Sequence, residues 1–187
     1  MKEGEDPRSQ RLTKNVETVA FHYEDASIAT SEEYIYQIAA AHARITSKAL
    51  IRERGSVATP SWMTEQARKI AATAPNGLIR EVRVVKGKEL EANGMNLFYN
   101  VGKGASDPPA GVFIHYQGRP EDPETVDLGI VGKGVTYDTG GLNIKVQMME
   151  LMYGDKGGSC AVLGALQGCI DLQLKKNVVF ACGFAEN

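Results

Sequence analysis

Three stretches of this chain are apolar almost without interruption, and they constrain the fold more than any other feature. They are GVFIHY (111–116), VDLGIVG (126–132) and NVVFACGFAEN (177–187). A strand with one solvated face alternates apolar and polar residues, so continuous apolar runs of this length indicate strands that are buried on both faces. The segment from Leu78, with Ile79, Val82 and Val84, has the pattern of a half-buried fourth strand.

Helical patterns separate these strands. The first helix is expected to begin at Thr30, which has capping-box spacing with Glu33, and to end near Ile51. The second helix has Thr59 as its N-cap and Pro60 at its first position. A third helix, rich in glycine, lies between the last two apolar runs. Because helices and buried strands alternate, we predict an α/β fold with a mixed, largely parallel sheet and flanking helices.

The composition is that of an ordinary globular protein and argues against several classes. The 187 residues carry a net charge of −2, without a basic stripe that would favour nucleic acid. No apolar stretch approaches the roughly 20 residues that span a bilayer, so no membrane is expected. The polar start lacks the apolar core of a secretory signal, although VETVAFHY (16–23) could form a short strand. Cys160, Cys169 and Cys182 are predicted to be buried, reduced thiols in a cytosol-like compartment.

Common catalytic motifs fail when they are tested against the glycine-rich regions. The phosphate-binding patterns GxxxxGK[ST] and GxGxxG break at the residues around Gly132 and Gly134. No HExxH or GxSxG motif occurs, and His22, His42 and His115 lie too far apart for a zinc motif, so structural roles are predicted for them. Cys160 is a conceivable nucleophile, but its apolar neighbours favour packing.

The charged residues that follow the run at 126–132 are the remaining candidates: Lys133, Asp138, Lys145, Glu150 and Asp155. Carboxylates bind hard divalent cations, and α/β sheets place ligands at the carboxyl ends of their strands. A lysine beside a metal can lose its proton and become a ligand, while a second lysine could stabilise an oxyanion. A metal-assisted hydrolytic site is one interpretation of this group. Loop charges that pair with one another are the other.

The stretches VGKGVTYDTGGLNIK, MELMYGDKGGSCAVLGAL and ACGFAEN together resemble the leucyl aminopeptidase (cytosol aminopeptidase) family of two-metal exopeptidases. The first of them fits the long and specific pattern VGKG-[IV]-x-[FY]-D-[ST]-GG-x-x-[IL]-K. Weaker similarity extends backward through MNLFYNVGKGASDPP and ATPSWMTEQA. The resemblance covers roughly residues 35–187 and is strong from residue 126 onward.

This resemblance implies a role for each of four residues. Lys133 matches a lysine that ligates one metal through its amine, and Asp138 matches an aspartate that bridges two metals. Asp155 matches an aspartate that binds one metal, and Lys145 matches the catalytic lysine that polarises the scissile carbonyl. The implied cofactors are two divalent ions, Zn or Mn, with Mg or Co as further candidates. The implied substrates are peptides with a free N-terminus, and the implied state is a cytoplasmic homo-oligomer, a hexamer.

The sequence departs from the family pattern in several places. The interval between Lys145 and Asp155 is one residue short, and Lys156 and Ser159 replace the usual methionine and alanine. Family members continue past AEN to a segment like NTDAEGR, which supplies the remaining carboxylate ligands and an arginine. We therefore expect the chain to be a portion of a longer protein. The alternative is a catalytically inactive relative that acts as a structural or interaction subunit of an assembly.

The resemblance also suggests a division of the chain into two parts. Residues 1–30 are predicted to be a polar lead-in or the remnant of an N-terminal domain. Residues 31–187 are predicted to be part of a catalytic metallopeptidase domain.

Overall fold

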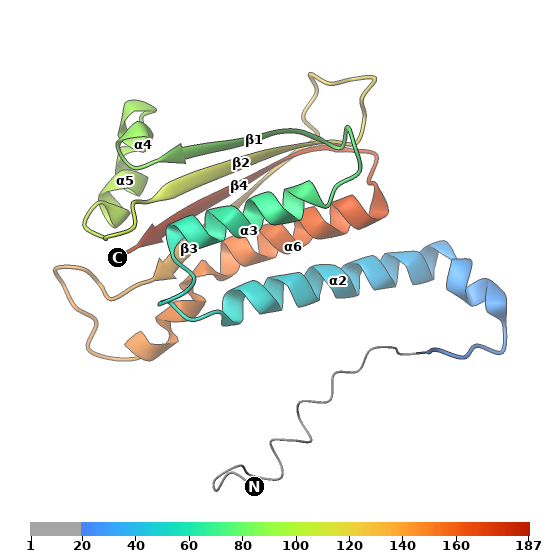
Figure 1. Ribbon diagram of the computed structural model, residues 1–187, viewed down its shortest axis with the longest axis horizontal. Coiled ribbons are helices and arrows are strands. Elements are labelled where there is room, and N and C mark those ends of the chain that lie inside the picture. The colour runs from blue at the N-terminus through green and yellow to red at the C-terminus, as the bar shows by residue number, and fades with distance from the viewer. Residues whose placement is uncertain (1–19) are drawn as a thin grey trace, which may run out of the picture.

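A four-stranded mixed sheet organises residues 20–187, the part of the chain that the computed structural model describes (Figure 1). The elements in chain order are η1 (Ala26–Thr30), α2 (Glu32–Arg52), α3 (Pro60–Ala72), β1 (Ile79–Lys86), α4 (Lys88–Ala92), α5 (Asn96–Gly102), β2 (Ala110–Gln117), β3 (Leu128–Tyr137), η2 (Met149–Lys156), α6 (Gly157–Leu172) and β4 (Asn177–Glu186). Within these residues, no helix is long and apolar enough to cross a membrane.

The strand order in the sheet is β1-β2-β4-β3. β2 pairs antiparallel with both β1 and β4, whereas β3 and β4 are parallel. Strands β1, β4 and β3 therefore run in one direction and β2 runs in the other. The crossover through η2 and α6 makes β3 and β4 parallel, because it returns the chain to the end of the sheet where β3 begins. The predicted α/β class, with a mixed sheet and flanking helices, is confirmed. The expectation that the sheet is largely parallel does not hold among the described strands, because β2 runs antiparallel to both of its neighbours.

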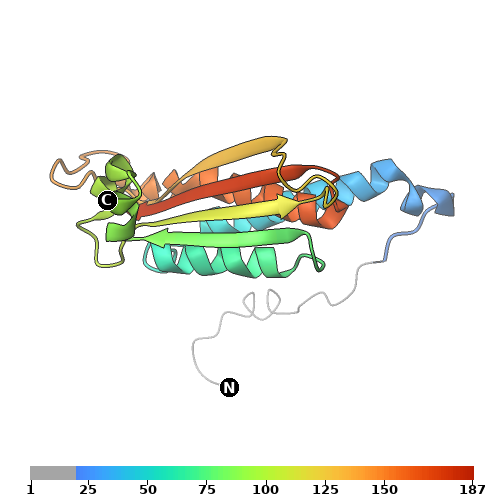
Figure 2. The same ribbon diagram turned by 90° about the horizontal axis from the view of Figure 1, so that it is seen from above.

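The long helices cover one face of this sheet. α3 and α6 lie side by side against the strands, and α2 packs on α6 (Figures 1 and 2). Alternate residues of the two central strands enter the core beneath α3 and α6: Val112, Ile114, Tyr116, Val178, Phe180, Cys182 and Phe184. On the opposite face Val131 is 81% exposed. The predicted burial on both faces therefore holds only in part within the described residues.

Helix α2 begins and ends close to the predicted positions, but its cap and its burial differ. Ser31, and not Thr30, is the N-cap, because its hydroxyl accepts a hydrogen bond from the Tyr34 amide at 3.2 Å. Thr30 belongs instead to η1. The apolar residues Ile35, Ile38 and Ile45 are 49–65% exposed, since α2 packs on another helix and not on the sheet.

Strand β3 extends further than its apolar run predicts. The prediction ended at residue 132, whereas the strand continues to Tyr137, so Lys133 lies within the strand. Sequence patterns also missed α4, α5 and η2, which are short. The short strand predicted at 16–23 is absent from residues 20–23, and the rest of that segment lies outside the described residues.

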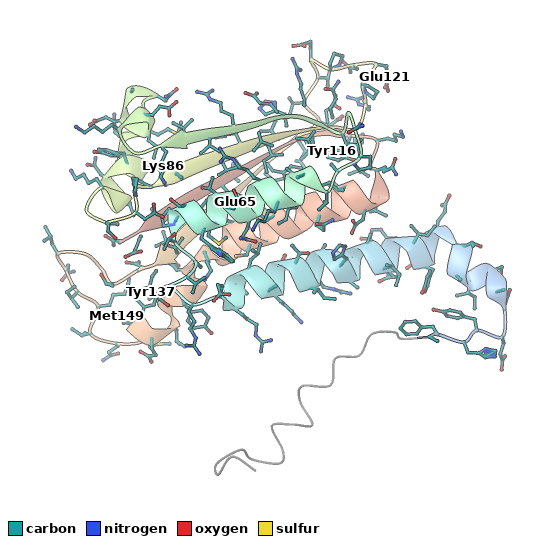
Figure 3. All side chains as sticks on the ribbon, in the orientation of Figure 1. Glu65, Lys86, Tyr116, Glu121, Tyr137 and Met149 are labelled. Carbon is teal, nitrogen blue, oxygen red and sulfur yellow. The ribbon has the colours of Figure 1, made fainter. Side chains whose placement is uncertain are left out.

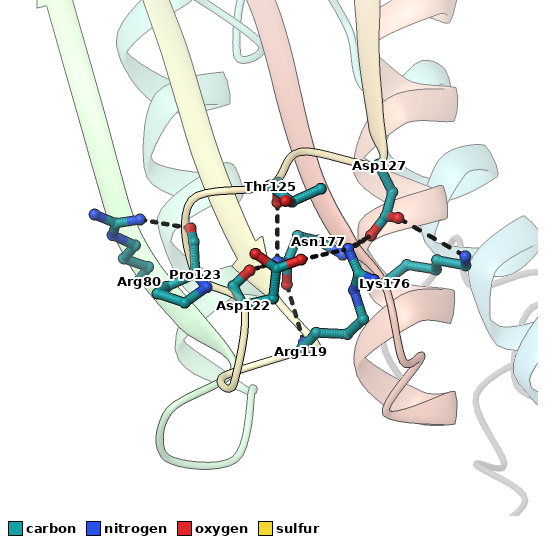
Figure 4. Close-up of polar contacts among 8 residues, drawn as sticks. All are labelled: Arg80, Arg119, Asp122, Pro123, Thr125, Asp127, Lys176 and Asn177. Atoms are coloured by element: carbon teal, nitrogen blue, oxygen red, sulfur yellow. Dashed lines mark hydrogen bonds and ion pairs between the residues drawn. The ribbon is translucent and has the colours of Figure 1, made fainter.

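A buried asparagine holds the loop between β2 and β3 in place. The side-chain amide of Asn177 donates hydrogen bonds to the carbonyl oxygens of Asp122 and Thr125, at 2.7 and 2.9 Å. The side-chain oxygen of Asn177 accepts a hydrogen bond from the backbone amide of Arg119, and the backbone amide of Asn177 donates to the Asp127 carboxylate (Figure 4). These contacts fix the point where β3 enters the sheet beside β4.

Asp107 closes the N-terminus of α3 from outside the helix. Its carboxylate accepts hydrogen bonds from the Ser61 amide at 2.7 Å and from the Ser61 hydroxyl at 2.5 Å. Lys86 Nζ lies 3.3 Å from the same carboxylate. Burial alone would raise the pKa of Asp107, but the hydrogen bonds from Ser61 and the contact with Lys86 lower it below its ordinary value.

We expect Asp107→Ala to lower the free energy of unfolding by about 1–3 kcal/mol, because the Ser61 amide in the first turn of α3 loses its acceptor. The loss in free energy of unfolding, relative to the unsubstituted protein, should have its full size above about pH 4–5, since a carboxyl group with a lowered pKa stabilises the fold while it is charged. It should shrink as the pH falls through the folded-state pKa. Urea denaturation at several pH values measures it, with the exposed Glu65→Ala on the same helix as control. Equal effects of the two variants would contradict the prediction.

Candidate metal centre

The candidate residues gather at one edge of the sheet, where β1, β3 and β4 end. Figure 3 shows Tyr137 and Met149 at this end of the molecule and Glu121 at the other. The turn after β3 carries Asp138 and Lys145, and η2 carries Asp155. Strand ends that point the same way bring these segments together, as expected for an α/β ligand site.

Lys133 and Asp155 form the first pair of the site. Lys133 Nζ lies 2.9 Å from the Asp155 carboxylate. The contact depends on a close approach between β3 and the start of α6: a Cβ on Gly132 would lie 2.6 Å from the Gly158 backbone, and a Cβ on Gly158 would lie 2.8 Å from the Lys133 amide nitrogen. Only glycine at both positions allows this distance, and the approach places the end of η2 beside the strand.

Asp138 and Lys145 form the second pair. Lys145 Nζ lies 3.2 Å from the Asp138 carboxylate, and the Lys145 amide donates to the Thr139 carbonyl at 2.8 Å. The chain reverses between them at Gly140, whose φ is +93° and whose Cβ would lie 2.2 Å from the Asn143 carbonyl oxygen. This turn brings a lysine seven residues along the chain back to the aspartate.

Asn187 is a participant that the sequence patterns did not single out. Its side-chain amide donates to Asp138 at 2.9 Å. Its backbone amide donates to the Tyr137 carbonyl at 3.0 Å, and its carbonyl accepts from the Thr139 amide at 2.6 Å. The parallel pairing of β3 with β4 was the available signal, because it places the residues that follow the two strands next to each other.

The Asp138 carboxylate is held in its charged form. Burial alone would raise its pKa, but hydrogen bonds from Asn187 and from the Gly140 amide, together with Lys145, lower it below its ordinary value. A carboxylate that is charged and partly shielded from water is prepared to bind a cation.

The donors at this edge suit divalent cations in kind. One amine and two carboxylates are ligands that Zn²⁺ or Mn²⁺ accept in proteins. Their number is small: among residues 20–187 no three or more His, Cys, Asp or Glu side chains come together as a metal-binding group. Each of the two carboxylates contacts a lysine, which compensates its charge. Lys133 and Asp155 from one pair and Asp138 from the other are the residues that could hold a metal, and the described residues alone do not make a complete metal centre.

The remaining candidates from the sequence have other surroundings. Glu150 is exposed on η2. Cys160 is buried, and burial raises the pKa of its thiol to about 11, so it is not a thiolate nucleophile near neutral pH. Its predicted packing role is confirmed. His42 contacts Asp171 at 2.7 Å and joins α2 to α6, in agreement with a structural role.

An α/β sheet with acidic and amine side chains at its carboxyl end has the arrangement in which proteins of this fold class bind their ligands. The model of the cytosol aminopeptidase family, catalytic domain, matches residues 45–187. The chain belongs to this family.

Individual relatives agree with this assignment. The probable cytosol aminopeptidase of Alkaliphilus metalliredigens (strain QYMF) is 38% identical over 148 residues, which are 79% of this chain and 28% of that protein. The probable cytosol aminopeptidase of Aquifex aeolicus (strain VF5) is also 38% identical over 148 residues, 79% of this chain and 29% of that protein.

Solved structures show the same fold. Leucine aminopeptidase LAP1 of Caenorhabditis elegans has a TM-score of 0.73 and 28% identity, over 83% of this chain and 31% of that chain. The bottromycin maturation enzyme BotP in complex with Mn has a TM-score of 0.73 and 32% identity, over 89% of this chain and 37% of that chain. The chain thus spans 28–37% of the length of these relatives and structures.

We expect Gly132→Ala to lower the free energy of unfolding by about 1–3 kcal/mol or more, because its Cβ would force the backbones of β3 and α6 apart. The Lys133–Asp155 contact should lengthen with them. Gly129→Ala, on the same strand, is the matched control, since a Cβ there meets nothing within 4 Å. Urea denaturation compares the two variants. A loss of stability in Gly129→Ala as large as that in Gly132→Ala would refute the explanation.

Proposed function

We propose that the protein containing this chain is a metal-dependent aminopeptidase that removes N-terminal residues such as leucine from peptides with the aid of two divalent ions. Membership of the cytosol aminopeptidase family is the observation that carries the proposal. The arrangement of Lys133, Asp138, Lys145 and Asp155 at one sheet edge supports it.

The proposed roles follow from the chemistry of each group. Lys133, Asp138 and Asp155 would hold the ions. Bound there, divalent ions supply a Lewis acid for the substrate amine and a water molecule of lowered pKa. A requirement for a free amine explains why only the N-terminal residue would be removed.

Lys145 is the proposed catalytic residue. Its ammonium contacts Asp138 at 3.2 Å, which keeps it beside the proposed metal donors. From there the ammonium would donate a hydrogen bond to the scissile carbonyl oxygen, where negative charge develops. Asn187 and Gly140 would keep the Asp138 carboxylate oriented.

Other properties of the whole protein remain part of the proposal. The similarity to BotP, whose structure was solved in complex with Mn, supports Mn²⁺ as one of the ions, with Zn²⁺ as the other main candidate. The names of the relatives support peptides as substrates and the cytosol as the compartment. The hexamer implied by the family resemblance stays a prediction, which light scattering of the purified protein would check.

A second candidate function is that of an inactive family member with a structural or interaction role. The small number of metal donors among the described residues favours it. The two candidates differ in metal content and in turnover, so measurements of both quantities separate them.

Lys145→Ala should lower kcat for hydrolysis of leucine p-nitroanilide by roughly 10²–10³-fold or more, because the developing oxyanion loses a donor. The assay uses the protein as the organism makes it, supplied with Mn²⁺ or Zn²⁺. Lys175→Ala is the control, since that lysine is exposed in the turn before β4. Undiminished turnover in Lys145→Ala would show that Lys145 takes no part in the reaction. Absence of turnover in the unsubstituted protein would favour the inactive candidate.

Chelation with EDTA should abolish hydrolysis, and added Mn²⁺ or Zn²⁺ should restore it. Metal affinity should rise with pH, because Lys133 must lose its proton to become a ligand.

Asp155→Asn should weaken metal binding by at least roughly tenfold, whereas Glu150→Gln, which changes an exposed residue of the same helix η2, should not. Calorimetric titration measures the affinities and elemental analysis the stoichiometry. Equal affinities of the two variants would exclude Asp155 as a ligand.

A further inference from the structure

Lys156 is fully buried, although lysine is rarely found without contact to water. It follows Asp155 directly and stands at the N-terminal boundary of α6. Burial of an ammonium group is costly unless polar partners surround it. A lysine in this place therefore needs an explanation that packing alone does not provide.

The partners of Lys156 are two backbone carbonyl groups from different segments. Its Nζ donates to the Tyr153 carbonyl at 2.6 Å and to the Glu53 carbonyl at 2.8 Å. The ring of Tyr153 also lies beneath the ammonium, 5.7 Å away, a distance at which cation–π attraction operates. The positive charge is thus shared among oxygens that already belong to the fold.

These two carbonyls have a particular position in the fold. Glu53 is the C-cap of α2, where the last carbonyls of the helix lack intrahelical partners and the helix dipole is negative. Tyr153 lies in η2. The end of α2 lies beside η2 in Figure 1, and the two elements are in contact. Lys156 therefore joins the end of one helix to the turn that precedes another.

The turn that Lys156 holds is the one that carries Asp155. η2 is a 3₁₀-helix, whose hydrogen-bond geometry is poorer than that of an α-helix. It follows a residue with positive φ, Met148 at +54°, so local backbone preferences do little to hold it. Contacts with the rest of the fold must supply the rigidity that a metal ligand requires.

We propose that Lys156 is a positioning residue: its ammonium holds η2 against the C-terminal end of α2 and thereby sets the place of the Asp155 carboxylate. The role of Asp155 as a metal ligand rests on the proposed function, whereas the hold on η2 does not. The proposal explains why a positive charge lies next to Asp155, because the ammonium of Lys156 donates its hydrogen bonds to carbonyl groups that need a donor.

Hydrogen exchange of the metal-free protein tests the hold on η2. Lys156→Met keeps the chain length but removes the ammonium, and it should speed exchange in residues 149–155 while the amides of β2 and β4 keep their protection. Lys48→Met, which removes an exposed lysine of α2, is the control and should change neither region. Unchanged exchange in residues 149–155 of Lys156→Met overturns the proposal. An equal increase across the whole sheet also overturns it, since a general loss of stability would then explain the result.

Chemical rescue provides a second measurement, which also serves if Lys156→Met does not fold. Lys156→Ala leaves room for n-propylammonium, which has the missing three carbons and the nitrogen. Added n-propylammonium should restore protection of residues 149–155 in Lys156→Ala and should have no effect on Lys48→Ala. If the amine fails to restore protection, the proposal is wrong.

Metal binding separates this proposal from the proposed function. Mn²⁺ affinity in Lys156→Met should be roughly tenfold to a hundredfold weaker, and Lys48→Met should bind as the unsubstituted protein does. If the unsubstituted protein binds no Mn²⁺ but exchange and rescue behave as expected, the hold on η2 stands and the proposed function fails. If Mn²⁺ binding and turnover are present and Lys156→Met changes neither affinity nor exchange, the proposed function stands and this inference fails.

Discussion

The candidate site depends on the close approach of the first turn of α6 to strand β3. Gly132 and Gly158 face each other there without room for a Cβ on either, so the two backbones meet more closely than side chains would allow. Ser159 strengthens the contact, because its hydroxyl donates to the Gly132 carbonyl at 2.7 Å. This approach brings the end of η2 to the strand. Without it, the Asp155 carboxylate would have no fixed relation to Lys133.

The charges around this contact compensate one another. Each of the two aspartates contacts a lysine. The third lysine, Lys156, donates its hydrogen bonds to main-chain carbonyl groups. Asp138 and Asp155 therefore each have a partner of opposite charge that the fold itself supplies.

The α/β class could be predicted from the sequence because apolar periodicity reports burial directly. The runs at 111–116 and 177–187 became β2 and β4, and Thr59 and Pro60 marked the start of α3 correctly. Short elements such as α4 and η2 could not be predicted, since so few residues provide no periodicity. The end of β3 was also missed: a glycine-rich run resembles a loop until a helix packs on it, and Lys133 consequently proved to lie within the strand.

The sequence by itself indicated which charged residues are candidates for a site, because lysines and aspartates spaced among glycines after a buried strand either pair with one another or bind a ligand. It also determined the family, through the long pattern at 131–145. Only the tertiary structure decided which of these residues meet. Lys133 contacts Asp155 from 22 positions away, and Asn187 contacts Asp138 through the parallel pairing of β3 and β4.

The tertiary structure also decided the surroundings of Lys156. Its ammonium finds the carbonyl of Glu53, 103 residues earlier, because packing of α2 on α6 brings the two together, and no local pattern specifies that contact.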